Sequence, residues 1–353
     1  MFSHTQYTTK TRQSFSVHQS NTTLISTGEN MNGSSGAAYS LVGRHFIKTW
    51  PYHLRQKALD EIYWYKTHSC KFRFFPEYYS SSQEHNSLSL SIERLVDYTS
   101  LLDRFSTYTD SCSDINTLYC NGIDKIFDEM HSFKSNIVLS QREWLRYLFK
   151  QTSNRIMSYC GKNALINKLT YESVVINDIS YLSISSCLQL LEQIISGHCT
   201  LLSSPQKAVL CHGDPHAGNI MTNGQDVKLI DPRGRFINSS AWFSPLYDEG
   251  KIIHDVFFEY SNIVSGKFRS FNDGKCWHLH QENNHYNLNR TLDFFNKKKS
   301  CGWLSYISGA LLLAGVLPFH YQRRWLQEFL LISTIALNRA INPQTYYLTW
   351  SHK

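Results

Sequence analysis

The sequence predicts an α+β fold with two lobes, a small β-rich lobe followed by a larger and mainly helical one. Short strand-like runs and one amphipathic helix occupy roughly the first hundred of its 353 residues. Beyond them, most apolar residues recur at helical spacing. We expect a flexible tail over residues 1–20, an N-terminal lobe over 21–97 and a C-terminal lobe over 98–353.

The elements of the N-terminal lobe follow one another closely. A short strand is expected at residues 23–26, followed by a turn rich in glycine, asparagine and serine at 27–36. Two apolar runs, AAYSLV and RHFIKTW, flank Gly43 and predict a hairpin. Residues 54–66 carry apolar side chains at helical spacing, and a second β-type run follows at 88–98. Together they predict a small sheet with one helix.

The C-terminal lobe is predicted to consist of helices with a single β-type island. Helical spacing is present in four segments, residues 145–159, 181–195, 252–263 and 322–341. The most apolar segment, 303–319, has no charged residue, but it is shorter than the ~20 apolar residues of a membrane span and is interrupted by glycine and proline. We therefore expect a buried helix there and no transmembrane segment.

Composition narrows the class of protein. The net charge is +7, yet no dense basic block is present, so no nucleic-acid partner is expected. A nucleic-acid-binding protein stays open as an alternative because of this charge and the 14% aromatic content. The nine cysteines are odd in number and lack C-x-x-C spacing, which indicates free thiols and a cytoplasmic location. No apolar leader segment is visible near the start.

The β-type island, HGDPHAGNIMTNGQDVKLID at residues 212–231, has the features of a metal site. Its Asn-Gly dipeptide joins two short β runs, 220–222 and 227–230, and predicts a hairpin. Asn219 precedes the first run and Asp231 follows the second, so both are expected at the open end of the hairpin. Their oxygens suit a Mg²⁺ ion that bridges phosphate oxygens.

A third polar residue of the island completes the parts needed for phosphoryl transfer. Asp214 lies five residues before Asn219 on the same loop. In this chemistry one carboxylate orients the attacking hydroxyl and accepts its proton, while the metal neutralises charge. Asp214 is therefore the candidate catalytic residue. The alternative is a surface hairpin with polar ends, but the full spacing, H-G-D-x-H-x-x-N with an Asp twelve residues later, favours a functional site.

The same segment resembles the catalytic and metal loops of the aminoglycoside phosphotransferase and choline kinase superfamily, which has a protein-kinase-like fold. The resemblance implies that Asp214 is the catalytic base and that Asn219 and Asp231 bind Mg²⁺. It also implies that His212 braces the loop and that His216 lies on its substrate side. For either histidine, a packed structural role is the favoured alternative.

Two departures from the family pattern are present. Pro215 stands where the family usually has leucine, and a loop tolerates its fixed φ. The residues Asp231-Pro232-Arg233-Gly234 stand where protein kinases have D-F-G. An I-D-P-R-G sequence is similar to phosphotransferase-like proteins of capsule or lipopolysaccharide biosynthesis. Arg233 is expected either to bind a phosphate or acidic sugar or to form a structural ion pair.

The N-terminal lobe contains residues that match a nucleotide clamp. The expected phosphate-covering turn consists of Gly33, Ser34, Ser35 and Gly36. Lys48 lies in a strand, FIK, that resembles the V-A-I-K lysine, and Glu61 follows thirteen residues later in the predicted helix. Ordinary surface charges are the alternative for both. The order of loop, strand lysine and helix glutamate favours a nucleotide site.

Two further segments resemble family features. Glu93-Arg94-Leu95 is similar to the hinge whose backbone binds adenine, which implicates Glu93 and Leu95. The sequence YDEGK at residues 247–251 resembles a Y-D-x-x-K motif at the start of a helix, where Asp248 is expected to hold the catalytic loop by hydrogen bonds.

These observations predict a phosphotransferase that uses ATP or GTP with Mg²⁺ and acts on a hydroxyl group of a small molecule. The I-D-P-R-G resemblance favours a sugar or polyol of surface-polysaccharide biosynthesis. Choline, ethanolamine and aminoglycosides remain open as acceptors. An ordinary protein kinase is disfavoured because no A-P-E follows Asp231. A pseudokinase without turnover is the alternative of another class, although the joint presence of Lys48, Asp214, Asn219 and Asp231 argues for activity.

Overall fold

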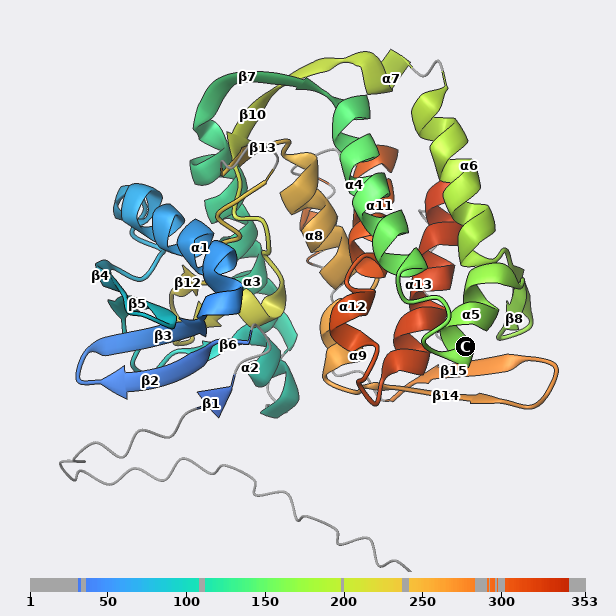
Figure 1. Ribbon diagram of the computed structural model, residues 1–353, viewed down its shortest axis with the longest axis horizontal. Coiled ribbons are helices and arrows are strands. Elements are labelled where there is room, and N and C mark those ends of the chain that lie inside the picture. Colours follow the sequence, from blue (N-terminus) through green and yellow to red (C-terminus); the bar gives the residue numbers. More distant parts are fainter. Residues whose placement is uncertain are drawn as a thin grey trace, which may run out of the picture.

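The computed structural model describes residues 31–32, 36–107, 112–197, 200–236, 241–282, 291, 293–295, 297 and 302–342. The expected tail, the strand at 23–26 and three residues of the expected phosphate turn, Gly33, Ser34 and Ser35, lie outside them. The described chain forms a smaller lobe built on a sheet and a larger lobe built on helices, which lie side by side in Figure 1.

The smaller lobe is a five-stranded antiparallel sheet with one helix against it. The strand order is β1-β2-β3-β5-β4. Its elements are β1 (Met31–Asn32), β2 (Ala38–Val42), β3 (His45–Pro51), α1 (Arg55–His68), β4 (Tyr78–Gln83) and β5 (Ser87–Glu93). The predicted hairpin around Gly43 is formed by β2 and β3, and the glycine has the positive φ of 57° that its turn needs.

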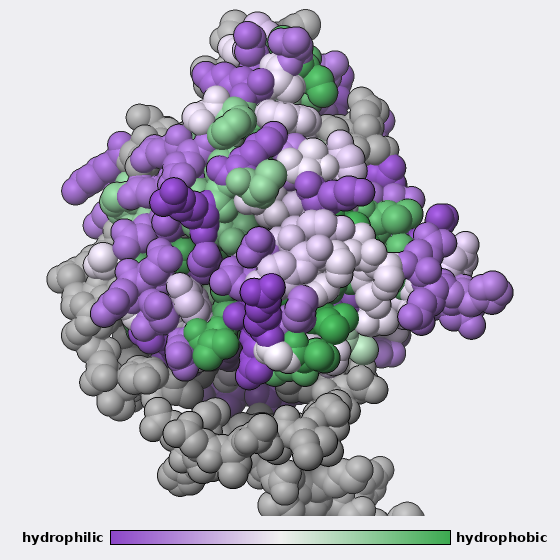
Figure 2. Space-filling model, turned by 90° about the vertical axis from the view of Figure 1, so that its left-hand side faces the viewer, coloured by the Kyte–Doolittle hydropathy of each residue, from purple (hydrophilic) through white to green (hydrophobic). Residues whose placement is uncertain are grey.

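Alternating side chains hold α1 on this sheet. Leu88, Leu90 and Ile92 of β5 are buried, as period-two alternation requires. Ala58 and Tyr65 are buried on α1, two turns apart along one side of the helix. Figure 2 shows that the outward face of this lobe is mostly hydrophilic, with small separate hydrophobic patches. Its apolar residues are therefore used mainly inside the lobe.

The larger lobe is organised around one apolar helix. α11 packs against α4, α8 and α13. The α-helices of this lobe with described bounds are α2 (Leu101–Thr107), α3 (Cys112–Asp124), α4 (Gln141–Met157), α5 (Ala164–Tyr171), α6 (Ile184–Ser196), α7 (Thr200–Ser203), α8 (Leu246–Val256), α9 (Tyr260–Val264), α11 (Trp303–Ala314), α12 (Leu317–His320) and α13 (Leu326–Ile341). By length and composition residues 303–320 would suffice to cross a membrane, but 72% of this segment is buried within the protein. Its apolar surface forms the core of the lobe, as the sequence predicts for a buried helix.

The prediction of a single β-type island in the C-terminal lobe is wrong. The described residues of this lobe form three small sheets, with the orders β13-β10-β7, β12-β11-β6 and β14-β15-β8-β9. Their strands are β6 (Thr99–Ser100), β7 (Lys134–Ser140), β8 (Val174–Ile176), β9 (Ile179–Tyr181), β10 (Pro205–Leu210), β11 (Ile220–Thr222), β12 (Val227–Leu229), β13 (Trp242–Phe243), β14 (Phe268–Asn272) and β15 (Trp277–Gln281). Most are two to six residues long and several pair with distant segments, so local periodicity does not reveal them.

The helix predicted over residues 252–263 is also wrong, because it is two helices. α8 ends at Val256 and α9 begins at Tyr260. Between them Glu259 has a φ of 57°, in the left-handed region that breaks a helix. α8 is buried on all sides over residues 250–256 and Ile263 of α9 is also buried, so apolar residues continue through the break and local spacing does not reveal it.

Candidate active site

The predicted hairpin of the β-type island is present and brings two sequence-predicted residues together. β11 and β12 pair Ile220 with Leu229 and Thr222 with Val227. The Ile230 amide donates to the Asn219 carbonyl at 3.0 Å, so the residues before and after the hairpin lie side by side. Asn219 and Asp231 are therefore neighbours at its open end.

Asn219 is also tied to the loop that carries Asp214. Its side-chain nitrogen donates to the Asp214 carbonyl at 2.9 Å, and it is 8% exposed. This hydrogen bond leaves the amide oxygen of Asn219 as the atom that can bind a cation. The three residues predicted from the sequence, Asp214, Asn219 and Asp231, thus meet in one place.

Asp214 has a buried cation beside it that the sequence analysis did not identify. The Lys251 ammonium lies 2.8 Å from Asp214 Oδ1, and Lys251 is 6% exposed. His216 Nε2 lies 3.8 Å from the other carboxylate oxygen. Burial raises the pKa of Asp214, but Lys251 and His216 outweigh it and hold that pKa well below its usual range. The carboxylate is therefore ionised.

Lys48 connects the two lobes. Its ammonium lies 2.9 and 3.1 Å from the two carboxylate oxygens of Glu61 and 3.0 Å from Asp231 Oδ1. Burial lowers the pKa of Lys48, but the carboxylates of Glu61 and Asp231 reverse this and raise it above its usual value. All three protons of a charged ammonium thus have a carboxylate acceptor. The expected strand-lysine and helix-glutamate pair is formed, and it extends to the Asp231 loop.

The Asp231 loop rests directly on α1. Asp231 and Gly234 have φ values of 55° and 72°. A Cβ atom on Gly234 would lie 2.2 Å from the Asp60 carbonyl oxygen of α1, so only glycine fits there. Arg235 Nε lies 3.5 Å from Asp60 Oδ1. The position of the loop is thereby coupled to the helix that carries Glu61.

Asp248, at the start of α8, holds the loop before Asp214. Its two carboxylate oxygens accept hydrogen bonds from the amides of His212 at 2.9 Å and Gly213 at 2.7 Å. Gly213 is needed because a Cβ atom there would lie 2.5 Å from Arg233 Cβ, and its φ is 85°. The contacts are those expected of a residue that fixes the backbone of the loop.

Asp255, two turns further along α8, holds the other end of the same loop. Its Oδ2 accepts from the Ala217 amide at 2.7 Å and from the Tyr119 hydroxyl at 2.6 Å, and its Oδ1 accepts from the Ser261 amide at 3.0 Å. Asp248, Lys251 and Asp255 follow the i, i+3, i+7 spacing of one helix face. One face of α8 therefore holds the loop backbone at two points and the Asp214 side chain at a third. Asp248 and Lys251 both belong to the Y-D-x-x-K motif of the sequence, but a role was predicted only for Asp248, and Asp255 was not among the predicted site residues.

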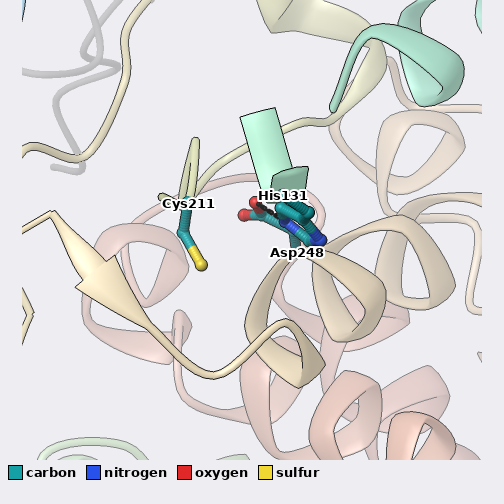
Figure 3. Close-up of side chains that lie close together, drawn as sticks. All are labelled: His131, Cys211 and Asp248. Carbon is teal, nitrogen blue, oxygen red and sulfur yellow. Dashed lines mark hydrogen bonds and ion pairs between the residues drawn. The ribbon is translucent and has the colours of Figure 1, made fainter. Parts of the chain in front are cut away.

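His131, Cys211 and Asp248 form a buried cluster whose potential metal-ligating atoms all lie within 4.8 Å of one another (Figure 3). His131 Nε2 lies 3.0 Å from Asp248 Oδ2, which also accepts the His212 amide. Burial raises the pKa of the Cys211 thiol well above its usual value, and its Sγ donates to the Ser244 carbonyl at 3.6 Å. His131 Nε2, Cys211 Sγ and Asp248 Oδ2 are already used in hydrogen bonds, and the Cys211 thiol stays protonated. We therefore interpret the cluster as part of the loop support.

The two loop histidines have different surroundings. His212 is fully buried, its Nδ1 accepts from the Asp214 amide at 3.2 Å, and its ring stacks on Phe75 at 5.8 Å. Burial lowers the pKa of His212, opposed by Asp248, so the ring is neutral. His216 Nδ1 accepts from the Gly218 amide at 3.0 Å, and its ring meets the Tyr260 ring at 5.5 Å.

Arg233 packs into the larger lobe. Its guanidinium donates to the Tyr247 hydroxyl and to the Arg235 carbonyl at 3.2 Å, and it lies over the rings of Phe236 and Tyr247. Its described hydrogen-bond partners are neutral oxygens, so neither a carboxylate partner nor a ligand is needed to explain its position.

The remaining predicted residues lie in the N-terminal lobe. Glu93 ends β5, and Leu95 lies in the connection that leads to β6 in the other lobe. Gly36 has a φ of 75°, and a Cβ atom there would lie 2.8 Å from Leu54 Cδ1 at the start of α1. The end of the predicted phosphate turn therefore lies against α1.

No known protein family and no curated protein sequence match this chain. Among solved structures, the chain is similar to a thermostable mutant of aminoglycoside phosphotransferase APH(4)-Ia. The apo form has a TM-score of 0.52 and 10% identity, over 85% of this chain and 89% of that chain. A ternary complex with ADP and hygromycin B has a TM-score of 0.50 and 10% identity, over 85% and 89% of the two chains. A second ternary complex, with AMP-PNP and hygromycin B, has a TM-score of 0.50 and 11% identity, over 89% and 91%. At this identity the similarity concerns the fold, and the predicted two-lobed, protein-kinase-like α+β fold is confirmed.

Proposed function

We propose that this protein is a phosphotransferase that uses ATP and Mg²⁺ to phosphorylate a hydroxyl group of a small molecule. The observation that carries this proposal is the convergence of Asp214, Asn219 and Asp231 with the buried Lys48–Glu61 pair, at 2.9 to 3.1 Å. These residues come from both lobes and supply the cation, metal ligands and carboxylate that phosphoryl transfer requires. The fold shared with a phosphotransferase crystallised with ADP and AMP-PNP supports the proposal.

The residues at the open end of the hairpin fit a magnesium ion. The Asn219 amide oxygen and the Asp231 carboxylate are hard oxygen donors, and Lys48 already places a positive charge 3.0 Å from Asp231 Oδ1. When bound, Mg²⁺ would neutralise charge on the phosphate oxygens. The Lys48 N–H group that donates to Asp231 would then donate to a phosphate oxygen instead, while Glu61 keeps the ammonium in place.

Asp214 is proposed to orient the acceptor hydroxyl. Because Lys251 and His216 hold its pKa well below the usual range, its carboxylate is a weak base. A loose phosphoryl-transfer transition state needs little proton removal before the new P–O bond forms. Asp214 therefore acts mainly by positioning the hydroxyl, and it accepts the proton late in the reaction.

We propose a sugar or polyol as the acceptor, on the basis of the I-D-P-R-G resemblance to phosphotransferase-like proteins of surface-polysaccharide biosynthesis. An aminoglycoside is the alternative that the neighbouring structures favour, because two of them contain hygromycin B. Choline and ethanolamine are further alternatives as acceptors, and GTP is the alternative to ATP. We also propose that the protein is located in the cytoplasm.

The test measures phosphate release and product formation from ATP and Mg²⁺ with a panel of hydroxyl compounds. We expect Asp214→Ala to lower kcat at least 100-fold, the scale on which a positioned acid or base contributes. Asp226→Ala is the matched control, because Asp226 is an exposed aspartate in the turn of the same hairpin. Removal of Mg²⁺ by a chelator should abolish turnover.

The alternative of another class is a pseudokinase. It is favoured if wild type and Asp214→Ala are equally inert across the panel while both still bind ATP. In that case the Lys48–Glu61 pair would serve nucleotide binding alone.

A further inference from the structure

Tyr260 lies beside the catalytic loop and is the centre of a group of three histidines. Its ring stacks on His254 at 4.2 Å, meets the loop residue His216 at 5.5 Å and meets His320 at 5.7 Å. It is the first residue of α9, directly after the left-handed Glu259. The three histidines come from the catalytic loop, α8 and α12. Tyr260 therefore lies where these elements meet, next to His216, which is two residues after Asp214.

A directed row of hydrogen bonds ends on the Tyr260 hydroxyl. The Trp325 indole nitrogen donates to His320 Nδ1 at 3.1 Å, and an indole N–H can only donate. Burial, together with Arg323, lowers the pKa of His320 to about 4, so its ring is neutral and carries its one proton on Nε2. That proton is donated to the Tyr260 oxygen at 3.3 Å. The Tyr260 hydroxyl proton is then directed at another acceptor, and no described residue provides one.

Glu259 fixes the turn that presents Tyr260. Its carboxylate accepts hydrogen bonds from Asn262 Nδ2 at 3.0 Å and from Gln281 Nε2. A left-handed φ on a residue other than glycine costs about 1–3 kcal/mol and persists only where surrounding contacts hold it. The contacts of Glu259 therefore hold a strained turn, and this turn sets the position of Tyr260.

The carboxylates near Tyr260 already have an ion-pair partner or hydrogen-bond donors. Asp214 has Lys251 at 2.8 Å, and the Asp255 oxygens accept from Ala217, Tyr119 and Ser261. His254 lies closest to the Tyr260 ring, and burial, with the Lys251 charge, lowers its pKa well below the usual value. Within the described residues, this group thus offers a hydroxyl donor and no uncompensated anion to hold an ammonium.

We propose that Tyr260 binds the acceptor substrate by donating its hydroxyl proton to an oxygen of an uncharged or acidic polyhydroxy compound. This inference rests on the proposed function and deepens it, because it names a specificity residue and favours uncharged or acidic acceptors over cationic ones such as aminoglycosides and choline. Tyr260 donates a hydrogen bond to one oxygen of the acceptor, while Asp214 orients the hydroxyl that is phosphorylated.

The experiment compares wild type, Tyr260→Phe and Tyr321→Phe in steady-state kinetics with ATP, Mg²⁺ and two acceptor groups. Glycerol, glucose and gluconate form the first group, and choline and hygromycin B form the second. Tyr321, which packs on Tyr159 at 4.7 Å, is a nearby tyrosine outside the group and serves as control. Tyr260→Phe removes one oxygen, and its thermal unfolding is compared with wild type to verify the fold.

We expect turnover with the first acceptor group, a KM for the acceptor about tenfold higher in Tyr260→Phe, and an unchanged KM for ATP. Tyr321→Phe should match wild type. A higher kcat/KM for choline or hygromycin B, or an acceptor KM in Tyr260→Phe within twofold of wild type, overturns the assignment of Tyr260. Asp214-dependent ATP hydrolysis that no member of the first group accelerates also overturns it. If no Asp214-dependent turnover of ATP occurs at all, the proposed function itself fails and the assignment fails with it.

Discussion

Lys251 is a buried lysine whose charge has a single described carboxylate partner, Asp214 at 2.8 Å. A buried ion pair is no guarantee of stability, because both charges lose solvation, but the removal of one partner leaves the other uncompensated. The Asp214 side chain is 37% exposed, which moderates that cost. The main effect of the pair is therefore to fix the position of the Asp214 carboxylate.

We expect Lys251→Met to lower the free energy of unfolding by about 1–3 kcal/mol at neutral pH, because it strands the Asp214 charge. Lys251→Arg should retain most of that free energy. The double variant Asp214→Asn/Lys251→Met should lose less than the sum of the two single variants. Urea denaturation of wild type, Asp214→Asn, Lys251→Met and the double variant measures this coupling, and strictly additive losses would contradict it.

Glu259 gives a pH dependence that can be tested without any substrate. Burial raises its pKa to about 7, against the opposing hydrogen bonds from Asn262 and Gln281. Between pH 4.5 and about 7 the folded state keeps a proton that the unfolded state has lost, so the free energy of unfolding falls as pH rises and is level above that range.

Glu259→Gln removes this titration. Its free energy of unfolding, measured relative to wild type, should therefore rise across that interval, by up to roughly 3 kcal/mol at pH 8. Denaturation curves at pH 5, 6, 7 and 8 provide the measurement. A constant difference between the two proteins at all four pH values would show that Glu259 is ionised throughout.

At the scale of elements, two contacts fix the geometry of the candidate site. The Asp231 loop crosses α1 at Gly234, and the catalytic loop lies along the face of α8 that carries Asp248 and Asp255. The first contact couples the predicted metal ligand to the helix of Glu61. The second gives the loop a rigid support from hydrogen bonds to its own backbone. The first depends on close approach of two main chains, and the second on aspartate side chains that reach the loop amides.

Gly234→Ala tests the first contact, with Gly43→Ala as control. Both glycines have positive φ, so both variants carry the strain of a left-handed alanine, about 1 kcal/mol. Only at Gly234 does the added Cβ meet backbone, 2.2 Å from the Asp60 carbonyl, whereas Gly43 has no atom within 4 Å. We expect Gly234→Ala to lose at least ~2 kcal/mol more than Gly43→Ala in urea denaturation, and to lower ATP hydrolysis as well. Equal losses would mean that the loop moves away from α1 freely.

At the scale of the whole molecule, α11 sets the position of α8 and hence of the site. Gly309 of α11 and Gly250 of α8 allow the helix axes to approach closely. A Cβ atom on Gly309 would lie 2.6 Å from Ile253 Cγ2, and one on Gly250 would lie 2.3 Å from Ser308 Oγ. The central helix of the core thus lies directly behind the helix face that holds the catalytic loop.

Gly309→Ala is therefore expected to destabilise the protein by about 1–3 kcal/mol, although alanine favours a helix. Gly122→Ala is the matched control within α3, because the nearest atom to its Cβ would be the terminal methyl carbon of Ile220, at 3.1 Å, and its three nearest atoms are all on that one side chain. That variant should change stability by less than about 1 kcal/mol in either direction. A thermal unfolding midpoint for Gly309→Ala equal to that of wild type would show that α8 and α11 separate without cost.

The sequence by itself determined the features that depend on local pattern. Short apolar runs joined by turn residues predicted the β2–β3 and β11–β12 hairpins, helical spacing predicted α1, and a charge-free apolar segment predicted the buried helix α11. The Asn-Gly turn placed Asn219 beside Asp231, because a hairpin necessarily joins its two ends. The fold class followed from the order of these elements.

The tertiary structure alone decided what depends on distant contacts. Lys251 and Asp255 act on a loop some forty residues earlier, and nothing in local spacing shows which side chain faces that loop. The break at Glu259 is held by hydrogen bonds from Asn262 and Gln281, and Tyr260 follows it directly with its ring against His216 of the catalytic loop. Periodicity reports which face of an element is buried, whereas the partner of each polar group is fixed only when the elements pack.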